Sequence, residues 1–222
     1  VLSVVSCVAF EALYEIIAKK RVTVKDLSAV VTGMLLAFAL PPTVPYYAVV
    51  IGAFAAIVIT KQLFGGIGQN FMNPALIGRA FLMASFPAAM TSFTTERLGI
   101  FEKTADVVTS ATRLSPMAAL SSANPPALSE LFIGRMADGT ALGGCIGETC
   151  SAAILLGLVY LVARRVISLR IPLTYMGSMM LMAMIFGRNP FEALFTGGVM
   201  LAAVFMATDY VTTPTTARGQ LI

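Results

Sequence analysis

The sequence contains no histidine and no tryptophan, and only 12% of its 222 residues are charged. Without histidine the chain alone cannot build a histidine-ligated metal site, a histidine general base or a Ser-His-Asp triad. These kinds of active site are therefore excluded within this chain. The charged fraction is also about half of the quarter that is usual in soluble globular domains.

Cysteine is scarce as well. Cys7 lies in an apolar run, and Cys145 and Cys150 lie close together at the edge of another. Iron–sulfur and zinc sites normally need four ligands, so this pair would complete such a site only with a partner protein. We interpret the three cysteines as small buried residues and keep the shared half-site as the alternative.

Hydrophobic residues are abundant instead, at 58% of the chain. Several apolar runs approach the roughly 20 residues that a helix needs to cross a bilayer. The sequence therefore predicts an all-α polytopic membrane protein surrounded by lipids. The net charge is +4. Membrane topology explains the distribution of the basic residues better than a nucleic-acid-binding surface does, so we predict no nucleic-acid partner.

The apolar runs predict the order of the helices. They cover 1–18, 27–40, 44–60, 74–90, 149–163, 171–186 and 190–207, and some are short enough to be re-entrant. One membrane domain, 1–222, would then consist of a first helix group (1–90), a long polar loop (91–147) and a second helix group (148–222). Because the chain starts at Val1 inside an apolar run, we expect it to be a portion of a longer protein.

Basic residues are distributed unevenly over this topology. Only Arg188 falls in the short turns of one side, whereas the other side carries Lys19, Lys20, Arg21, Lys25, Lys61, Arg164, Arg165, Arg170 and Arg218. Lysine and arginine are retained on the cytoplasmic side of membrane proteins. The 91–147 loop is therefore predicted to be extracytoplasmic.

Two Asn-Pro pairs, Asn73-Pro74 and Asn189-Pro190, each begin the third helix of a group. Asparagine is a good N-cap and proline suits the first helical position, so the pairs alone indicate helix starts. On the predicted topology the two helices run in opposite directions, as in the inverted repeats of transporters. We predict an inverted repeat of three-helix units, and a permease or channel is one function that such a repeat favours.

The polar loop contains the segment Asp106-Val107-Val108-Thr109-Ser110-Ala111-Thr112. Serine and threonine in loops usually bond to their own backbone. The segment nevertheless resembles the sequence that flavin transferases recognise in membrane flavoproteins of the Rnf and Na⁺-translocating NADH:quinone oxidoreductase complexes. The stretches 65–82 and 205–209, with Gly219-Gln220, resemble the same family. The Thr-Ser-Ala-Thr form is more similar to the RnfD branch of this family than to the NqrB branch of the quinone reductase.

The resemblance implies FMN joined through its phosphate to the hydroxyl of Thr112, with riboflavin as a second, noncovalent flavin. A threonine hydroxyl is a weak nucleophile, so a separate flavin transferase acting on a metal-bound flavin dinucleotide is expected to form the ester. Asp106 would serve recognition or metal contact in the complex with the transferase, and a loop-capping role is its alternative. The attachment segment is completed by Thr109, Ser110 and Ala111.

Two arginines are further candidates for flavin binding. Arg113 stands where the family is expected to have proline and is the nearest local cation for the phosphate, although a solvated arginine is the alternative. Arg79 lies within the predicted span 74–90, and a charge inside a span usually faces a cavity, a partner or the interface. It would face a flavin or the ion path, unless its side chain simply extends to the membrane surface. No residue is predicted to bind a metal.

The resemblance thus implies an electron-transfer subunit with covalent FMN, in a complex that couples ferredoxin:NAD⁺ oxidoreduction to Na⁺ or H⁺ translocation. Its partners would be the other membrane and peripheral subunits in a bacterial or archaeal cytoplasmic membrane. The chain alone holds no complete catalytic site. The alternatives are the NqrB component of the quinone reductase, a permease or channel without a redox role, and a scaffold protein.

Overall fold

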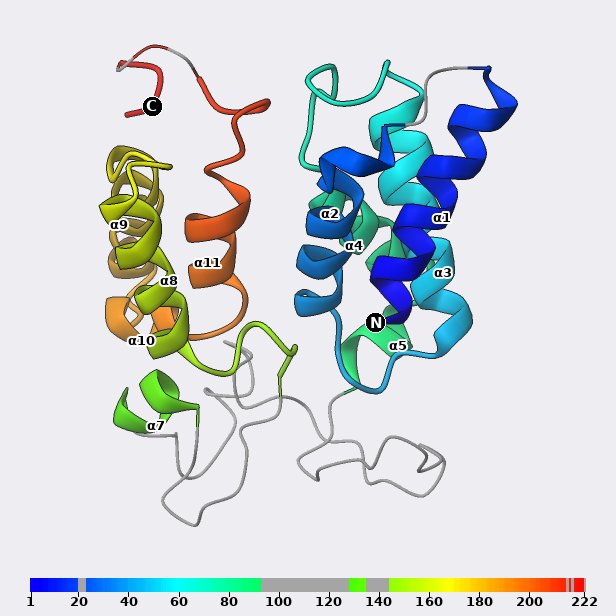
Figure 1. The fold of residues 1–222 in the computed structure, drawn as a ribbon. Coiled ribbons are helices and arrows are strands. Elements are labelled where there is room, and N and C mark those ends of the chain that lie inside the picture. The colour runs from blue at the N-terminus through cyan, green and yellow to red at the C-terminus, as the bar shows by residue number, and fades with distance from the viewer. Residues whose placement is uncertain (20–22, 93–127, 135–143, 215, 217, 222) are drawn as a thin grey trace. The chain divides into compact units, whose positions relative to one another are not determined.

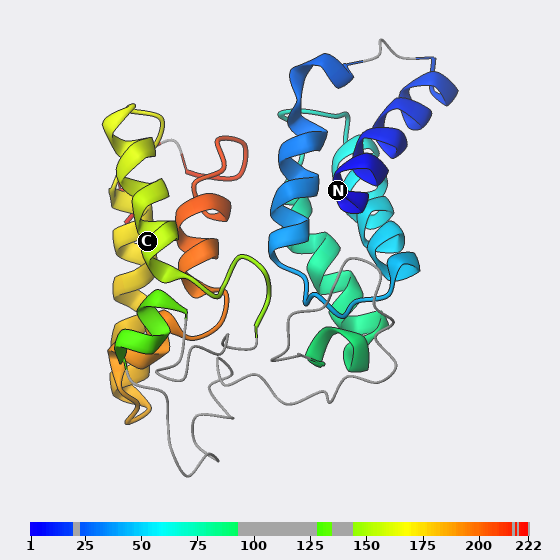
Figure 2. The ribbon, with the colours of Figure 1, turned by 60° about the horizontal axis from the view of Figure 1, so that its bottom comes forward.

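The computed structural model describes residues 1–19, 23–92, 128–134, 144–214, 216 and 218–221, and this part of the chain is helical without a strand (Figures 1 and 2). It divides into two compact units. Unit 1 consists mainly of Val1–Leu40 and Val44–Met90, and unit 2 mainly of the described residues between Thr91 and Thr208. The prediction of an all-α chain is confirmed for these residues, while the inverted repeat stays a prediction.

Unit 1 contains the helices of the first predicted group. They are α1 (Leu2–Ile17), the short 3₁₀ turn η1 (Val24–Asp26), α2 (Ser28–Phe38), α3 (Tyr46–Phe54), the π-helix η2 (Ala55–Gln62), α4 (Pro74–Ser85) and α5 (Pro87–Thr91). Helix α3 continues directly into η2, so the run predicted at 44–60 is one continuous helical segment.

Small residues let the helices of unit 1 approach one another closely. A Cβ atom added at Gly33 of α2 would lie 2.7 Å from the Cα atom of Val4 in α1. The hydroxyl of Ser3 donates to the carbonyl oxygen of Gly33 over 2.8 Å at the same contact. Leu36, Ile57 and Leu82 belong to the apolar core between these helices, and each is 0% exposed. The helices of unit 1 are therefore tightly packed, with small residues at the closest helix contacts and large apolar side chains in the core.

The span predicted at 74–90 is interrupted. Helix α4 ends at Ser85, and α5 begins at Pro87 after Phe86, whose φ is −134° and ψ is 57°. A proline ring disfavours the α conformation of the residue before it and supplies no N–H for an intrahelical bond. Pro87 therefore explains why the single helix predicted at 74–90 is divided into α4 and α5.

Unit 2 contains α7 (Leu128–Ile133), α8 (Ser151–Ala163), α9 (Arg170–Ile185), α10 (Pro190–Phe195), α11 (Val199–Leu201) and the π-helix η4 (Ala202–Met206). Gly157 of α8 faces Phe205 of η4, because an added Cβ would lie 2.7 Å from the Cζ atom of that ring. Helix α7 lies inside the interval predicted as a loop, 91–147, and its Phe132 packs edge-to-face with Phe195 of α10.

The span predicted at 190–207 is also broken. Helix α10 ends at Phe195 and α11 begins at Val199, with Thr196, Gly197 and Gly198 between them. Gly197 has a φ of +66°, a conformation that glycine adopts without a steric penalty and other residues avoid. The prediction of a continuous helix was wrong here because the Gly-Gly pair interrupts the hydrogen-bond ladder.

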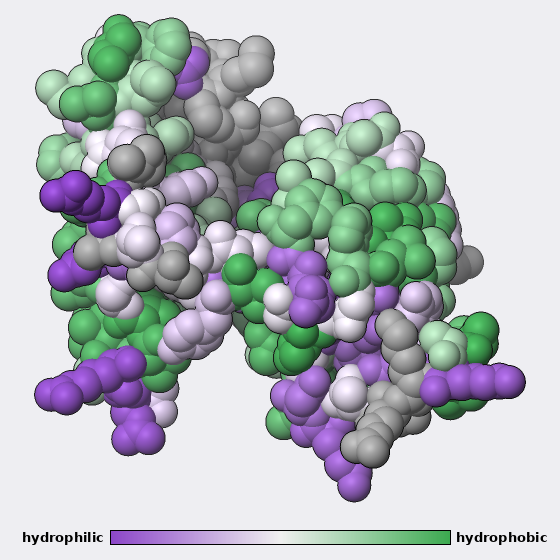
Figure 3. Space-filling model, turned by 90° about the horizontal axis from the view of Figure 1, so that it is seen from above, coloured by the Kyte–Doolittle hydropathy of each residue, from purple (hydrophilic) through white to green (hydrophobic). Residues whose placement is uncertain are grey.

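Hydrophobic side chains cover much of the visible surface of each unit, and hydrophilic ones gather in separate patches (Figure 3). The exposed apolar side chains include Ile17 of α1, 72% exposed, and Leu156 of α8, 72% exposed. Within the described ranges, no single helix combines the length and the apolar character required to cross a membrane.

Candidate functional site

A buried polar cluster in unit 1 is the first candidate site. We call it the Glu11 cluster, and it consists of Glu11 of α1, Ser28 of α2, and Lys61 and Gln62 of η2. Lys61 forms an ion pair with Oε1 of Glu11, and Nε2 of Gln62 donates to the same oxygen over 3.0 Å. Glu11 is 0% exposed and Lys61 is 3% exposed. The carboxylate of Glu11 and the ammonium group of Lys61 are thus buried as a pair. Burying either charge alone would cost much more free energy.

The π-helix places the two partners of Glu11. In η2 the hydroxyl of Thr60 donates to the carbonyl oxygen of Ala55 over 3.0 Å, and Leu63 N–H bonds to the carbonyl of Val58, five residues earlier. The wider turn of a π-helix changes which residues share a face, and such turns are frequent at functional sites. Here Lys61 and Gln62, which are adjacent in the sequence, both reach Glu11.

A glycine turn ends this segment. Gly66 N–H bonds to the carbonyl oxygen of Lys61 over 3.0 Å, and both Gly65 and Gly66 have positive φ values, +120° and +99°. A residue with a Cβ is strained in such conformations. Gly65 and Gly66, the first two glycines of the stretch 65–82, therefore end the helical segment shortly after the residues that bond to Glu11.

The cluster extends from the core to the surface of unit 1. Lys61 Nζ donates to the hydroxyl oxygen of Ser28, and that hydroxyl donates to Oδ1 of Asp26 over 2.7 Å. Asp26 is exposed. The result is an unbroken chain of polar contacts from an exposed carboxylate to a fully buried one.

One atom of the cluster is unsatisfied. Oε2 of Glu11 is buried and has no hydrogen-bond partner within the described part of the chain. A buried carboxylate oxygen without a donor is costly and calls for an explanation such as a bound ion or a functional role. Chemically, the free oxygen can accept a proton or contact a small cation.

Sequence reasoning missed this cluster. It only assigned Lys61 to the cytoplasmic side in the charge count, whereas the structure buries its side chain against Glu11. The available signal was the pair Glu11 and Glu15, two acids four residues apart and therefore on one face of an otherwise apolar helix. Glu15 has its own partner, because Thr23 N–H donates to its Oε2 over 2.9 Å.

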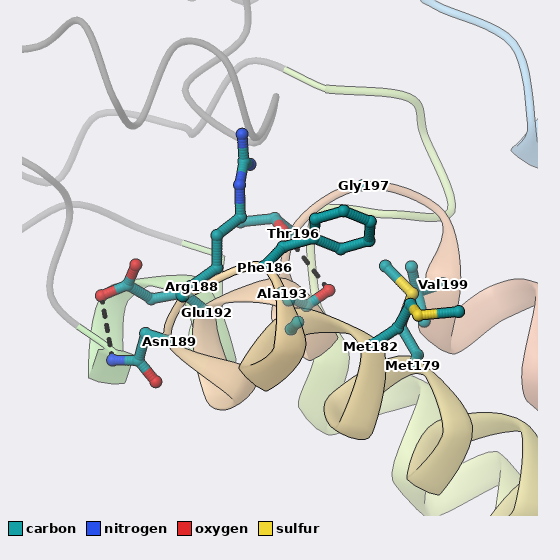
Figure 4. A pocket seen from close by; sticks show the side chains of 12 residues that line it. Met179, Met182, Phe186, Arg188, Asn189, Glu192, Ala193, Thr196, Gly197 and Val199 are labelled. Atoms are coloured by element: carbon teal, nitrogen blue, oxygen red, sulfur yellow. Dashed lines mark hydrogen bonds between the residues drawn. The ribbon is translucent and has the colours of Figure 1, made fainter.

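A pocket of about 900 Å³ in unit 2 is the second candidate site. Its walls come from the end of α9, the turn at 187–189, α10 and the break before α11 (Figure 4). Met179, Met182 and Val199 form an apolar side, while Asn189 and Glu192 lie together on a polar side. Asn189 Nδ2 donates to Oε1 of Glu192 over 3.2 Å.

The helix break shapes this pocket. Asn189 Oδ1 accepts the N–H of Phe191 over 3.1 Å and so starts α10, and Thr196 N–H bonds to the carbonyl of Glu192 over 2.9 Å where α10 ends. Thr196 and Gly197 both line the pocket. Broken helices that line a cavity expose backbone groups for ligands, as in many transporters.

Comparison with known proteins identifies the family. The model described as "NQR2, RnfD, RnfE family" matches residues 1–222. The chain belongs to this family. The resemblance drawn from the three sequence stretches is confirmed.

Three curated relatives are D-subunits of ion-translocating complexes. The D-subunit of the Na⁺-translocating ferredoxin:NAD⁺ oxidoreductase complex of Acetobacterium woodii is 46% identical over 219 residues, covering 99% of this chain and 66% of the relative. The D-subunit of the proton-translocating ferredoxin:NAD⁺ oxidoreductase complex of Clostridium ljungdahlii is 38% identical over 231 residues, with 99% and 68% covered. The D-subunit of the ion-translocating oxidoreductase complex of Rhodobacter capsulatus is 35% identical over 253 residues, with 99% and 69% covered. The chain thus spans about two thirds of the length of these relatives.

The structure places only one of the flavin residues predicted from this family resemblance. Arg79 lies on α4 and is half-buried, and its role towards a flavin or an ion path stays a prediction. The attachment residues lie outside the described residues; they are Asp106, Thr109, Ser110, Ala111, Thr112 and Arg113. Of the cysteines, Cys145 is buried and Cys150, at the start of α8, is partly exposed. The flavin attachment and the shared half-site both stay predictions.

Proposed function

We propose that this family member is an electron-transfer subunit that carries FMN on Thr112 within an ion-translocating ferredoxin:NAD⁺ oxidoreductase complex. The observation that carries the proposal is the attachment segment, 106–112, in a chain whose relatives are named as D-subunits of such complexes. When bound, FMN supplies electron transfer, while the protein sets its position and electrostatic surroundings. The other subunits of the complex would be the partners.

The surface of the chain supports a location in the cytoplasmic membrane. Large apolar side chains are exposed on α1, α8 and α9, including Ile16, Val159 and Leu181, each at least 62% exposed. An extended apolar surface on a soluble monomer would be a liability, whereas lipids or partner subunits cover it favourably. The 91–147 interval would then lie on the extracytoplasmic side, opposite Lys19 and Lys25.

The covalent flavin is tested on the denatured polypeptide. The full-length protein would be co-produced with its flavin transferase, denatured, separated by electrophoresis and viewed under ultraviolet light. We expect a fluorescent band that disappears in Thr112→Val and persists in Thr104→Val, a control threonine outside the attachment segment. A fluorescent Thr112→Val band, or a dark wild-type band, would refute the assignment of Thr112.

The Glu11 cluster supports a role of this chain in ion movement. A fully buried carboxylate with one unsatisfied oxygen gives an ion path through unit 1 a point where a proton or a small cation can be held. Lys61 is its fixed counter-charge, and the contacts of Lys61 with Ser28 and of Ser28 with the exposed Asp26 connect this point to the surface. Ionisable groups inside membrane proteins are rare and usually mark such paths or their counter-ions. We therefore include Glu11 in the proposed function as a residue that couples electron transfer to the movement of Na⁺ or H⁺.

The ion-movement part is tested in the intact complex reconstituted into vesicles. Glu11→Gln is expected to lower ion uptake per NADH formed severalfold while ferredoxin:NAD⁺ turnover continues. Glu15→Gln is the matched control, because Glu15 is buried on the same helix but is bonded to Thr23. Unchanged coupling in Glu11→Gln would remove Glu11 from the proposal. Ion flux that proceeds without ferredoxin would favour the permease or channel alternative.

A further inference from the structure

Several arginines gather at one end of unit 2, where α8 ends and α9 begins. We call them the arginine patch, and they are Arg164, Arg165, Arg170 and Arg218. Arg164 is the C-cap of α8, and Arg170 is the first residue of α9. The hydroxyl of Thr174, in the next turn of α9, donates to the carbonyl oxygen of Gln220 over 3.2 Å. This bond holds the turn that contains Arg218 beside the start of α9.

The patch carries charge of one sign. All of its side chains are exposed, and none forms an ion pair with an acid in the described part of the chain. The described acids of unit 2, Glu130, Glu148 and Glu192, lie on α7, before α8 and on α10, at the opposite end of the unit (Figure 1). Asp209 belongs to unit 1, and its carboxylate accepts the N–H of Val211 over 3.4 Å. The patch is therefore available to an anion that does not come from the described residues.

Helix stability does not account for the patch. A cation is favourable near a helix C-terminus, which suits Arg164, but it is unfavourable at a helix N-terminus, where Arg170 lies. Arg165 has a φ of +56° directly after the end of α8, and its N–H bonds to the carbonyl oxygen of Val162 over 2.9 Å. This position at a helix end usually has glycine, because a Cβ atom disfavours the left-handed conformation. Arg165 and Arg170 therefore lie where the fold alone favours other residues, and an anion bound to their side chains would offset that cost.

An exposed apolar stripe adjoins the patch on each helix. Leu156 and Tyr160 precede Arg164 at helical spacing on one face of α8, and they are 72% and 64% exposed. Leu173 follows Arg170 on α9 and is 58% exposed. Hydrophilic side chains project from this end of unit 2 beside hydrophobic surface (Figure 3). Positive charge and apolar surface thus meet at the same end of the unit.

We propose that the arginine patch binds the phosphate headgroup of an anionic phospholipid whose acyl chains lie along α8 and α9. The inference rests on the membrane location given under the proposed function and adds a ligand to it. A guanidinium group can donate two parallel N–H bonds to a phosphate, and basic residues at the cytoplasmic ends of membrane helices bind anionic headgroups. The ring of Tyr160 suits the boundary between the acyl chains and the headgroups.

A lipid matches the surface better than other anions do. A free phosphate ion would use the arginines and leave both apolar stripes uncovered. An acidic soluble protein would meet the arginines from the aqueous side and would also leave the stripes uncovered. A phospholipid has an anionic group and apolar chains in one molecule, so it covers the patch and the stripes together.

The test measures lipid binding to the full-length protein in detergent. Native mass spectrometry counts the molecules of phosphatidylglycerol or phosphatidylcholine that stay on the protein when each lipid is added at the same concentration. We expect the wild type to retain severalfold more phosphatidylglycerol, and the double variant Arg164→Gln with Arg170→Gln to lose this preference. Equal retention of the two lipids by the wild type, or a preference that persists in the double variant, would overturn the proposal.

Lys19→Gln with Lys25→Gln is the matched control, because it removes two exposed positive charges from unit 1. This variant should keep the preference for phosphatidylglycerol. The same lipid should raise the Tm of the wild type and of the lysine variant, but not that of the arginine variant, since a ligand that binds the folded state stabilises it. Equal losses in both double variants would mean that net charge, and not the arginine patch, attracts the lipid.

Two further measurements identify the anion. Glycerol 3-phosphate has the phosphate without acyl chains, so at the concentration of the lipid it should leave phosphatidylglycerol bound. Displacement would show a phosphate site without a lipid and would overturn the proposal. Purification of the whole complex with the arginine variant tests a protein partner: loss of a subunit while the lipid preference persists would assign the patch to that subunit instead.

Extraction of membranes with alkaline carbonate separates the lipid site from the proposed function. The wild type and the arginine variant should both stay in the membrane, and both should keep the fluorescent band of the denatured polypeptide. Release of the wild type by carbonate would refute the membrane location. A wild type that stays in the membrane but shows no lipid preference would refute the lipid site alone.

Discussion

Helices α4 and α10 begin with the same signal and end very differently. Each has an asparagine N-cap followed by proline, but α4 continues for 12 residues and α10 for only 6. Helix α4 buries Gly78 and Leu82, whereas α10 contains no buried residue. The capping pair therefore determines where a helix begins, and packing together with Pro87 or Gly197 determines where it ends.

The two candidate sites differ in a related way. In the Glu11 cluster the charges of Glu11 and Lys61 are packed and buried between α1, α2 and η2, and only Ser28 and Asp26 connect them to the surface. The pocket of unit 2 is open and lies beside a helix break. Close packing holds an ion pair in a fixed geometry, while a broken helix leaves space for a ligand. Substitutions in one unit at a time test whether packing causes this difference between the two sites.

The largest effect is expected from separating the buried ion pair. Lys61→Met leaves Glu11 as an uncompensated buried charge, which typically costs about 3–5 kcal/mol of stability. Replacing both residues, Glu11→Leu with Lys61→Met, removes both charges and should recover a large part of that loss. Thermal unfolding of the purified full-length protein in detergent measures both variants. Lys25→Met, at an exposed lysine, is the control and should change stability little.

A double variant that is as unstable as Lys61→Met would contradict this explanation, because the cost would then come from lost packing rather than from an unpaired charge. It would also weaken the contrast between a packed site that depends on a buried ion pair and an open pocket.

A smaller effect is expected from adding one methyl group in each unit. In Gly33→Ala the new Cβ would lie 2.7 Å from Val4 Cα and 3.1 Å from the carbonyl oxygen of Ser3, and these backbone atoms cannot move independently of α1. Overpacking of this kind typically costs about 1–3 kcal/mol. Gly177→Ala in α9 meets nothing within 4 Å and should be neutral or stabilising by up to about 1 kcal/mol through helix propensity.

Denaturation midpoints of the two glycine variants, measured side by side in the same detergent, decide this prediction. Equal destabilisation by both substitutions would show that the close contact between α1 and α2 is not the cause.

Much of the fold was predictable from local sequence. The apolar runs located α1, α2, α3 with η2, α8 and α9, and the Asn-Pro pairs located the starts of α4 and α10. The two interrupted spans were not predicted, although Pro87 and Gly197-Gly198 were visible. Hydrophobicity continues across both breaks, and a run that stays apolar gives no sign that its hydrogen-bond ladder stops.

The sites were less predictable, for two different reasons. Glu11 and Lys61 are 50 residues apart, and their pairing depends on the turn of η2, which no local pattern specifies. Thr112, in contrast, was identified by family resemblance and not by composition. It lies outside the described residues, so its role stays a prediction. Local sequence indicates which residues are unusual, while tertiary packing decides which of them meet.

The smallest effect is expected from removing the N-caps of α4 and α10, the two helices that begin with the same Asn-Pro pair. Asn73 accepts the N–H groups of Ala75 and Leu76 over 3.0 and 3.3 Å and is buried, whereas Asn189 accepts one N–H group, that of Phe191, and is exposed. Replacing a capping asparagine with alanine typically costs about 0.5–2 kcal/mol. Asn73→Ala should lie towards the upper end of that range and Asn189→Ala towards the lower end. Parallel thermal unfolding of both variants measures the difference; a larger loss in Asn189→Ala would mean that the short helix α10 depends on its cap more than packed α4 does.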